Sequence, residues 1–246
     1  MIKKTIVTGM VAIMSLAAMA LPAKRGLTNV ITLNDGTKVE VSLVGDEFMH
    51  YWQDAYGNKY VPTGEANVFK LADASAVSNL TTRALARKAK AHSRRAARRN
   101  LSNATDVFQG KKKGLVILVE FTDVKFKNSD SQTLFNRIAN EAGYNEGYFQ
   151  GSVKDYFLAQ SRGQFELDFD VVGPVKLAHN MKYYGGNDAN GYDLHPEEMI
   201  VEACKGIDSK VDFSKYDWDG DGEVDQVYVI SAGYGEADTG KENTIW

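Results

Sequence analysis

The sequence has 246 residues, of which 43% are hydrophobic, and its formal net charge is −3. A chain of this length and composition can bury a substantial core, so we expect a globular protein with one domain and a smaller appendage. Its single cysteine, Cys204, excludes an internal disulfide, so stability must come from packing or from a bound ion.

The N-terminus has the pattern of a secretory signal peptide. Lys3 and Lys4 precede an apolar run from Thr5 to Ala20, which ends in the small residues of "AMA". We expect residues 1–20 to be removed after Ala20. A membrane anchor is the alternative, but a spanning helix needs about 20 apolar residues, and no second apolar run of that length follows. The sequence therefore predicts a secreted protein without a stable membrane span.

The next part, residues 21–80, is predicted to be a small β-rich module. Apolar and polar residues alternate between about Leu27 and Leu71, around the turn sequences "NDG", "GDE" and "AYGN". This combination is typical of short antiparallel strands joined by tight turns.

Residues 81–113 form a basic segment. Arg83 to Arg99 contains eight Lys or Arg residues and no acidic one, and it is rich in alanine. This composition favours an exposed helix or a solvated linker. Nucleic acid is not an expected partner, because no aromatic residue is interleaved to stack on a base and the protein is exported. Two interpretations stay open: a merely solvated linker, or a processing linker cleaved by trypsin-like proteases at Arg94–Arg95 and Arg98–Arg99.

Residues 114–246 are predicted to form an acidic α/β (α+β) domain. They contain 11 basic and 24 acidic residues, a net charge of −13. "GLVILVEFTD" predicts a strand buried on both faces, and "QFELDFDVVGPVKL" an alternating strand with Pro174 at its end or at a sheet edge. "DQVYVISAGYGEA" predicts a second buried strand. Three helical segments lie between these strands.

Start and stop signals place the first two helices. "SQTLFNRIANEAG" opens on Ser131 as the expected N-cap and closes on Gly143. "SVKDYFLAQSRG" opens on Ser152 and closes on Gly163 in the same way.

The third helix lies in "HPEEMIVEACKGID", with Pro196 at the first helical position, acids in the first turn and Gly206 just past the end. Four of its residues share one helical stripe, so the cysteine is interpreted as a buried apolar residue and not as a nucleophile: Met199, Ile200, Ala203 and Cys204.

Carboxylates at alternate positions follow this helix in "DWDGDGEVD". Their spacing matches positions 1, 3, 5, 6 and 9 of a calcium-binding loop: Asp217, Asp219, Asp221, Gly222 and Asp225. Glu223 would offer its backbone carbonyl at position 7. Tyr228 occupies position 12, where a bidentate glutamate belongs, and a strand follows instead of a helix. The motif therefore predicts oxygen-only coordination outside a true EF-hand, and its single copy argues against a paired module.

Calcium suits this loop better than other metals. Magnesium prefers fewer carboxylates and retained waters, and zinc prefers nitrogen and sulfur ligands, which the loop lacks. The alternative is a solvent-exposed acidic turn, in which converging carboxylates would repel one another without a cation. We expect a structural calcium ion that links the last helix to the last strand.

Catalytic motifs are not found in these 246 residues. The four histidines are scattered, and none lies four residues from another as in HExxH. A serine nucleophile elbow and a phosphate-binding loop are also absent. Asp168 and Asp170 alternate on a predicted strand and could serve as a glycosidase acid and base, but an exposed strand face is the favoured interpretation.

Several stretches resemble, in the same order, secreted bacterial zinc metallopeptidases of the immune inhibitor A type: "LVILVEFTD", "SVKDYFLAQSRGQFELDFDVVGPVKL", "MIVEACKGID", "VDFSKYDWDGDGEVDQVYVISAGYGEA" and "NTIW". They cover nearly all of residues 114–246, and the resemblance implies the N-terminal part of a zincin-like domain. "TLNDGTKVEVSLVGDEFMHYW" resembles the pro-region found ahead of that domain, so residues 21–80 are expected to be a pro-region.

The resemblance implies hydrolysis of protein or peptide substrates, with zinc held by an HExxH helix and a third ligand. In the family that helix follows "TIWPH"-like residues, whereas this sequence ends at Trp246 on an apolar "GKENTIW". We therefore expect a truncated, inactive chain without zinc ligands or general base, and zinc only in the complete enzyme. The calcium loop carries over, and Gly233–Ala237 is expected near the edge of the substrate cleft. The alternative is a non-catalytic secreted calcium-binding module that acts by adhesion or by inhibiting a protease.

Overall fold

The computed structural model describes residues 22–46, 48–65, 67–101, 108–189 and 191–246, and for residues 94–101 it describes the backbone only. The expected signal peptide, residues 1–20, lies outside the described residues. None of the helices described has a stretch that is both long and apolar enough to cross a bilayer.

Five short strands form a small closed barrel near the N-terminus. They are β1 (Thr28–Leu33), β2 (Lys38–Asp46), β3 (Met49–Gln53), β4 (Lys59–Pro62) and β5 (Val68–Leu71). Neighbours pair antiparallel in chain order, and β1 closes the barrel by pairing in parallel with β5. Alternate side chains point inward and form the core, which includes Ile31, Val41, Leu43, Trp52 and Phe69. The strands predicted from the alternation are confirmed.

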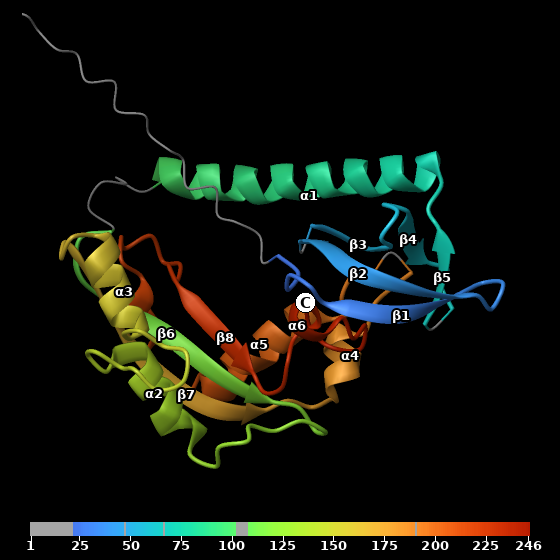
Figure 1. The fold of residues 1–246 in the computed structure, drawn as a ribbon. Helices are drawn as coiled ribbons and strands as arrows, with labels where there is room; N and C mark the ends of the chain where they lie inside the picture. The colour runs from blue at the N-terminus through green and yellow to red at the C-terminus, as the bar shows by residue number, and fades with distance from the viewer. Residues whose placement is uncertain (1–21, 47, 66, 102–107, 190) are drawn as a thin grey trace, which may run out of the picture.

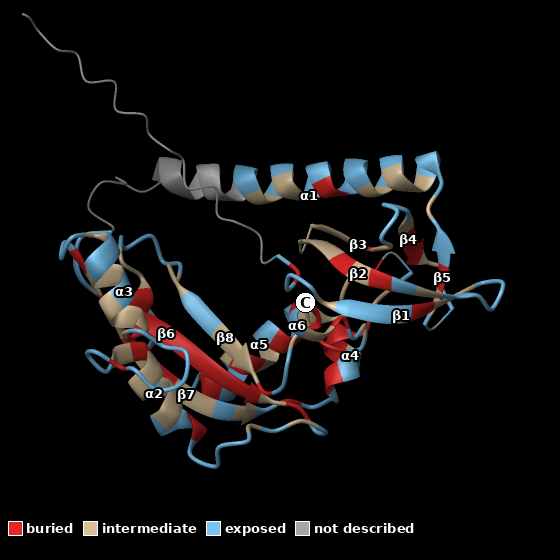
Figure 2. Cartoon of the chain, viewed as in Figure 1, coloured by how far each residue is buried: buried red, intermediate tan, exposed pale blue. Residues whose placement is uncertain are grey.

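A single long helix, α1 (Ala74–Leu101), follows the barrel and holds most of the basic segment. The carboxylate of Asp73 accepts a hydrogen bond from the Ala76 N–H at 2.7 Å and caps the first turn. Figure 2 shows α1 largely exposed along its described length, and Ala84 is its one buried residue among those whose side chains are described. Of the two forms expected for this segment, an exposed helix is observed over residues 81–93, where the side chains are described.

The larger domain contains a parallel sheet of three strands in the order β7-β6-β8. These are β6 (Gly110–Glu120), β7 (Phe165–Lys176) and β8 (Val227–Ser231). Strand β6 is central, and Leu115–Val119 are buried on both faces, as predicted. Figure 1 shows the barrel and this layered domain side by side, with α1 extending past the barrel.

Helices cover both faces of this sheet. Leu115, Ile117 and Val119 of β6 pack on one side against α4 (Met181–Gly185) and α5 (Pro196–Ile207). The alternate residues Val116 and Leu118 pack on the other side against α2 (Ser131–Asn140) and α3 (Val153–Gln160). The fold is therefore a mixture of helices and strands of the α+β kind, with two cores separated by the sheet.

The first two helices differ from the prediction at their ends. The N-cap of α2 is Asp130, whose side chain accepts a hydrogen bond from the Thr133 N–H, so the prediction of Ser131 as the cap was wrong by one residue. Ser152 caps α3 as predicted, in a reciprocal capping box with Asp155. Both helices end three residues before their predicted glycines. Glu141 is already extended after α2, and Arg162 has a positive φ after α3.

Helix α5 starts with Pro196 as predicted, but Gly206 lies within the helix and not past its end. A β-carbon at Gly206 would lie 2.4 Å from Val175 Cγ1, so the glycine permits close packing of α5 on β7. The predicted stripe is also shifted, because the inward face consists of Met199, Ala203 and Ile207, while Ile200 is exposed. Cys204 packs at the edge of this core and is partly buried.

Strand β8 was predicted to be buried, but it is at an edge of the described sheet and half-exposed, with Val227 and Tyr228 37% and 41% exposed. Pro174 lies in the edge strand β7, in agreement with its predicted position. Three short elements were not predicted from the sequence, namely α4, the 3-10 helix η1 (Phe213–Tyr216) and α6 (Glu236–Thr239).

Candidate metal centre

The acidic loop between η1 and β8 brings together three of the five predicted ligand residues. Carboxylate oxygens of Asp217, Asp219 and Asp225 all lie within 4.8 Å of one another. Of the four predicted carboxylate ligands, Asp221 stands outside this group, and its carboxylate instead accepts a hydrogen bond from the Glu223 N–H at 2.8 Å. Glu223 is predicted to bind through its backbone carbonyl, so the convergence of side chains does not bear on it. The loop therefore presents a convergent set of three side chains at positions 1, 3 and 9 of the motif.

Backbone hydrogen bonds to Asp217 set the shape of the loop. Its Oδ1 accepts from the Gly220 N–H at 2.7 Å, and its Oδ2 accepts from the Gly222 N–H at 2.9 Å. Both glycines have positive φ angles, +78° and +87°, which side chains with a β-carbon rarely adopt. The hydrogen bonds, that of Gly222 above all, lower the pKa of Asp217. The first ligand residue is thus held in place and ionised.

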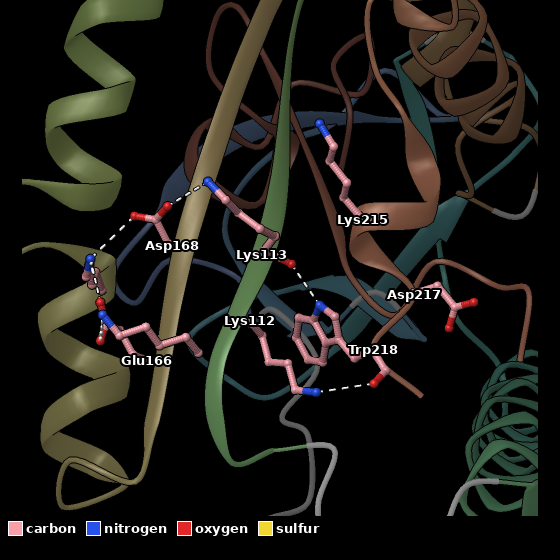
Figure 3. Close-up of a pocket in the computed structure, with 9 residues that line it drawn as sticks. Lys112, Lys113, Glu166, Asp168, Lys215, Asp217 and Trp218 are labelled. Carbon is pink, nitrogen blue, oxygen red and sulfur yellow. Dashed lines mark hydrogen bonds and ion pairs between the residues drawn. The ribbon is translucent and has the colours of Figure 1, made fainter. Parts of the chain in front are cut away.

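Trp218 anchors the loop to the central strand. Its indole Nε1 donates a hydrogen bond to the Lys113 carbonyl at 2.7 Å, and its ring packs edge-on against Phe165. The Trp218 N–H donates to the Asp225 carboxylate, and the Asp225 N–H donates to the Tyr216 carbonyl at 2.9 Å. The two ends of the loop are therefore tied together and fixed at the start of β6 (Figure 3).

A shallow, charged hollow of about 450 Å³ adjoins the loop (Figure 3). Its positive charges come from the first half of β6, from α3 and from η1: Lys111, Lys112, Lys113, Lys154 and Lys215. Lys112 Nζ donates to the Trp218 carbonyl at 3.2 Å, which adds a second link between β6 and the loop. Glu166 and Asp168 on β7 pair with the lysines across the hollow.

These ion pairs bear on the two carboxylates considered as a glycosidase acid and base. Lys113 Nζ lies 2.7 Å from Asp168 Oδ2 and 3.0 Å from Asp170 Oδ1. The hydrogen bond from Lys113 holds the pKa of Asp168 below its usual range, the opposite of what a general acid needs. The Asp168 and Asp170 side chains are 43% and 39% exposed, in agreement with the favoured interpretation of an exposed strand face.

The histidines are dispersed in the structure as they are in the sequence. His179 stacks on Tyr183 at 3.9 Å between ring centroids, and Nδ1 of His195 at the start of α5 lies 3.1 Å from Glu198 Oε1. His50 is partly buried, with both ring nitrogens inaccessible to solvent, where the barrel meets the layered domain. Within the described residues, only the Asp217 group brings three or more potential His, Cys, Asp or Glu ligands together.

The donor set of the loop fits a hard cation. All its convergent candidate ligand atoms are carboxylate oxygens, which calcium accepts in variable number and which zinc disfavours. Asp217, Asp219 and Asp225 could hold such an ion, and the carbonyl of Glu223 and the side chain of Asp221 are the further oxygens that the motif offers.

Comparison with known proteins gives one partial match. An alignment over 171 residues, which covers 55% of the chain, is 29% identical to Immune inhibitor A of Bacillus thuringiensis subsp. alesti. The chain spans about a quarter of the length of that curated relative, since the match covers 25% of it. No family model matches the chain. The similarity supports a related family, in agreement with the resemblance read from the sequence motifs.

Proposed function

We propose that this chain belongs to the precursor of a secreted zinc metalloendopeptidase. Residues 21–80 would be its pro-region, 81–113 a linker whose last residues, 110–113, already belong to β6, and 114–246 the N-terminal part of a zincin-like domain. The observation that carries the proposal is the 29% identity to Immune inhibitor A over 171 residues. The mixed helix-and-strand fold of residues 110–246 is compatible with it.

The zinc site of this proposal lies outside the 246 residues. The sequence contains no HExxH motif, and the match covers only 25% of the relative's length. Zinc, when bound in the complete enzyme, would activate the water that attacks the peptide bond. The residues described here would build and stabilise the scaffold next to that site, with Gly233–Ala237 at the edge of the substrate cleft. None of them is assigned a catalytic role.

We further propose that the acidic loop holds a structural calcium ion. Asp217, Asp219 and Asp225 would bind it through their carboxylates, and the loop would then be fixed between η1 and β8. A ligand that binds only the folded state at 100 times its Kd stabilises that state by about 2.7 kcal/mol. For a domain of this size, that corresponds to a rise in melting temperature of roughly 5–10 °C.

Calcium binding can be tested by thermal unfolding of the chain. We expect a chelator to lower the melting temperature and calcium, but not magnesium, to restore it. Asp219→Asn should abolish most of the calcium-dependent shift, whereas Glu40→Gln, on the exposed face of β2, should keep it. Identical melting curves with calcium and with excess chelator would rule the site out.

The peptidase proposal is tested on the natural secreted product. We expect that product to hydrolyse an unstructured protein such as casein, and expect a zinc chelator to stop the reaction and added zinc to restore it. A product that binds calcium and hydrolyses no peptide would instead support a non-catalytic calcium-binding module.

A further inference from the structure

A buried polar cluster lies where the barrel meets the layered domain, away from the acidic loop. Glu236 is the first residue of α6 and only 2% exposed. Its Oε1 accepts a hydrogen bond from Asn187 Nδ2 at 3.1 Å, but its Oε2 has no hydrogen-bond partner among the described residues. Asn187 Oδ1 and Asp193 Oδ1 are likewise buried without such a partner. Buried polar atoms of this kind are rare and need a physical reason.

The barrel closes this cluster off from solvent. A cavity of about 20 Å³ has walls from both modules, among them His50, Trp52, Phe69, Asn187, Glu236 and Glu242. The Lys24 N–H donates to the Ala237 carbonyl at 2.8 Å, next to Glu236. Trp52 packs so closely on Gly240 that a β-carbon there would lie 2.6 Å from the indole. Glu236 is therefore buried because the barrel is docked against α6.

The charged groups around Glu236 do not compensate a carboxylate. Asp193, which precedes α5, and Glu242, which follows α6, both repel a negative charge on Glu236. The ring nitrogens of His50 in β3 are themselves buried. Arg87 of α1 lies 4.0 Å over the Tyr192 ring, and its positive charge acts to lower the pKa of Asp193 and of His50. No ion pair to Glu236 forms within the described part of the chain. A proton on Oε2 is the simplest way to remove the unpaired charge.

We propose that Glu236 is a protonation latch, so that the barrel docks on the layered domain when this carboxyl group is neutral and is released when it ionises. The partner that this surface recognises is the barrel of the same chain. The proposal is independent of the peptidase proposal, because it concerns only contacts between two described modules.

The direction of the pH dependence follows from burial. A free glutamate has a pKa of 4.5, whereas burial, assisted by repulsion from Asp193 and Glu242, raises the pKa of docked Glu236 to about 8. The contribution of Glu236 to docking is complete below pH 4.5 and is lost as the pH rises toward 8. Between these values the docking equilibrium should fall by up to tenfold per pH unit.

Three neighbouring groups also titrate, and they determine the pH range in which the effect of Glu236 on docking can be measured. Burial lowers the pKa of His50 below 6.5, so acid weakens docking through His50 only below that pH. Burial also raises the pKa of Asp193 to about 6. Ionisation of Asp193 therefore weakens docking only up to about pH 6, and above that pH its contribution no longer changes. Glu242, whose pKa burial raises as well, acts in the same direction as Glu236. The interval from pH 6.5 to pH 8 is thus the informative one.

Hydrogen exchange of the full chain tests the proposal, with rates corrected for the intrinsic pH dependence of exchange. Peptides that cover Ala23–Leu27 and Glu236–Gly240 should open at least tenfold more at pH 8 than at pH 6.5. Leu115–Val119 of β6 serve as an internal reference and should show no such change. Glu236→Gln should remove most of the pH dependence of both interface peptides and leave only the part that Glu242 contributes, whereas Glu40→Gln should keep all of it.

Three results would overturn the latch. Interface opening in the wild type could be independent of pH, or β6 could open in parallel, which would indicate global destabilisation. The third is a Glu236→Gln variant whose interface peptides still open tenfold more at pH 8 than at pH 6.5. If Glu236→Gln does not fold, the wild-type comparison of interface peptides with β6 still decides, since it needs no substitution.

Discussion

Replacing Gly206 by alanine places a methyl group in the contact between α5 and β7. The new β-carbon would lie 2.4 Å from Val175 Cγ1 and 3.1 Å from its Cγ2. In an open helix the same change would stabilise the protein, because alanine is favoured over glycine by about 1 kcal/mol. Overpacking of a filled core costs roughly 1–3 kcal/mol and acts against this gain. We expect the overpacking to prevail and Gly206→Ala to lower the free energy of unfolding by about 1 kcal/mol.

A double-mutant cycle isolates this contact. Val175→Ala alone should cost about 1–2 kcal/mol, because it removes two partly buried methyl groups. In the double variant the alanine methyl at position 206 occupies the vacated space, so the combined loss should be smaller than the sum by at least about 1 kcal/mol. Urea unfolding followed by circular dichroism gives the three values. A Gly206→Ala protein more stable than the wild type, or strictly additive losses, would refute the close approach of α5 to β7.

Three further substitutions test the fold and its ion pairs. Ser152→Ala removes one half of the capping box of α3 and should cost about 1 kcal/mol in urea unfolding; an unchanged midpoint would contradict the capping role. Leu118→Ala empties part of the core under α2 and α3 and should cost about 2–5 kcal/mol, whereas a loss below 1 kcal/mol would mean that this side chain is not buried. Lys113→Gln removes the ammonium group that pairs with both Asp168 and Asp170. The hydrogen bond from Lys113 holds the pKa of Asp168 below 3.8, so this ion pair stabilises the fold above that pH. This variant should be less stable than the wild type at pH 7, and the difference should shrink as the pH falls below 3.8; a constant difference from pH 7 to pH 2.5 would contradict the ion-pair assignment.

The sequence predicted most regular elements because their local signals agree with the packing. Leu115–Val119 form a continuous apolar run, and the structure buries them from both sides. Alternation in the N-terminal module identified its strands, because one face of each lines the barrel core. In the acidic loop the spacing identified three carboxylates that converge, those of Asp217, Asp219 and Asp225, but it also predicted Asp221, which lies outside the group.

Other features depend on contacts that a single segment does not reveal. Gly206 looks like a helix end in the sequence, and only Val175 on a distant strand explains why the helix continues through it. Trp218 reads as an ordinary apolar residue, although its hydrogen bond to the Lys113 carbonyl fixes the acidic loop. Glu236 lies in an unremarkable "GEA", and its burial requires the barrel, 180 residues earlier in the chain, to dock on α6.

The metal content of the natural secreted product tests the central proposal most directly. The product should be purified without chelators and weighed under native conditions by mass spectrometry, before and after removal of metals. The account predicts one zinc ion together with at least one calcium ion, and it predicts that the calcium is lost in Asp219→Asn while the zinc is retained. A product that carries calcium but no zinc would contradict the assignment to a zinc metalloendopeptidase.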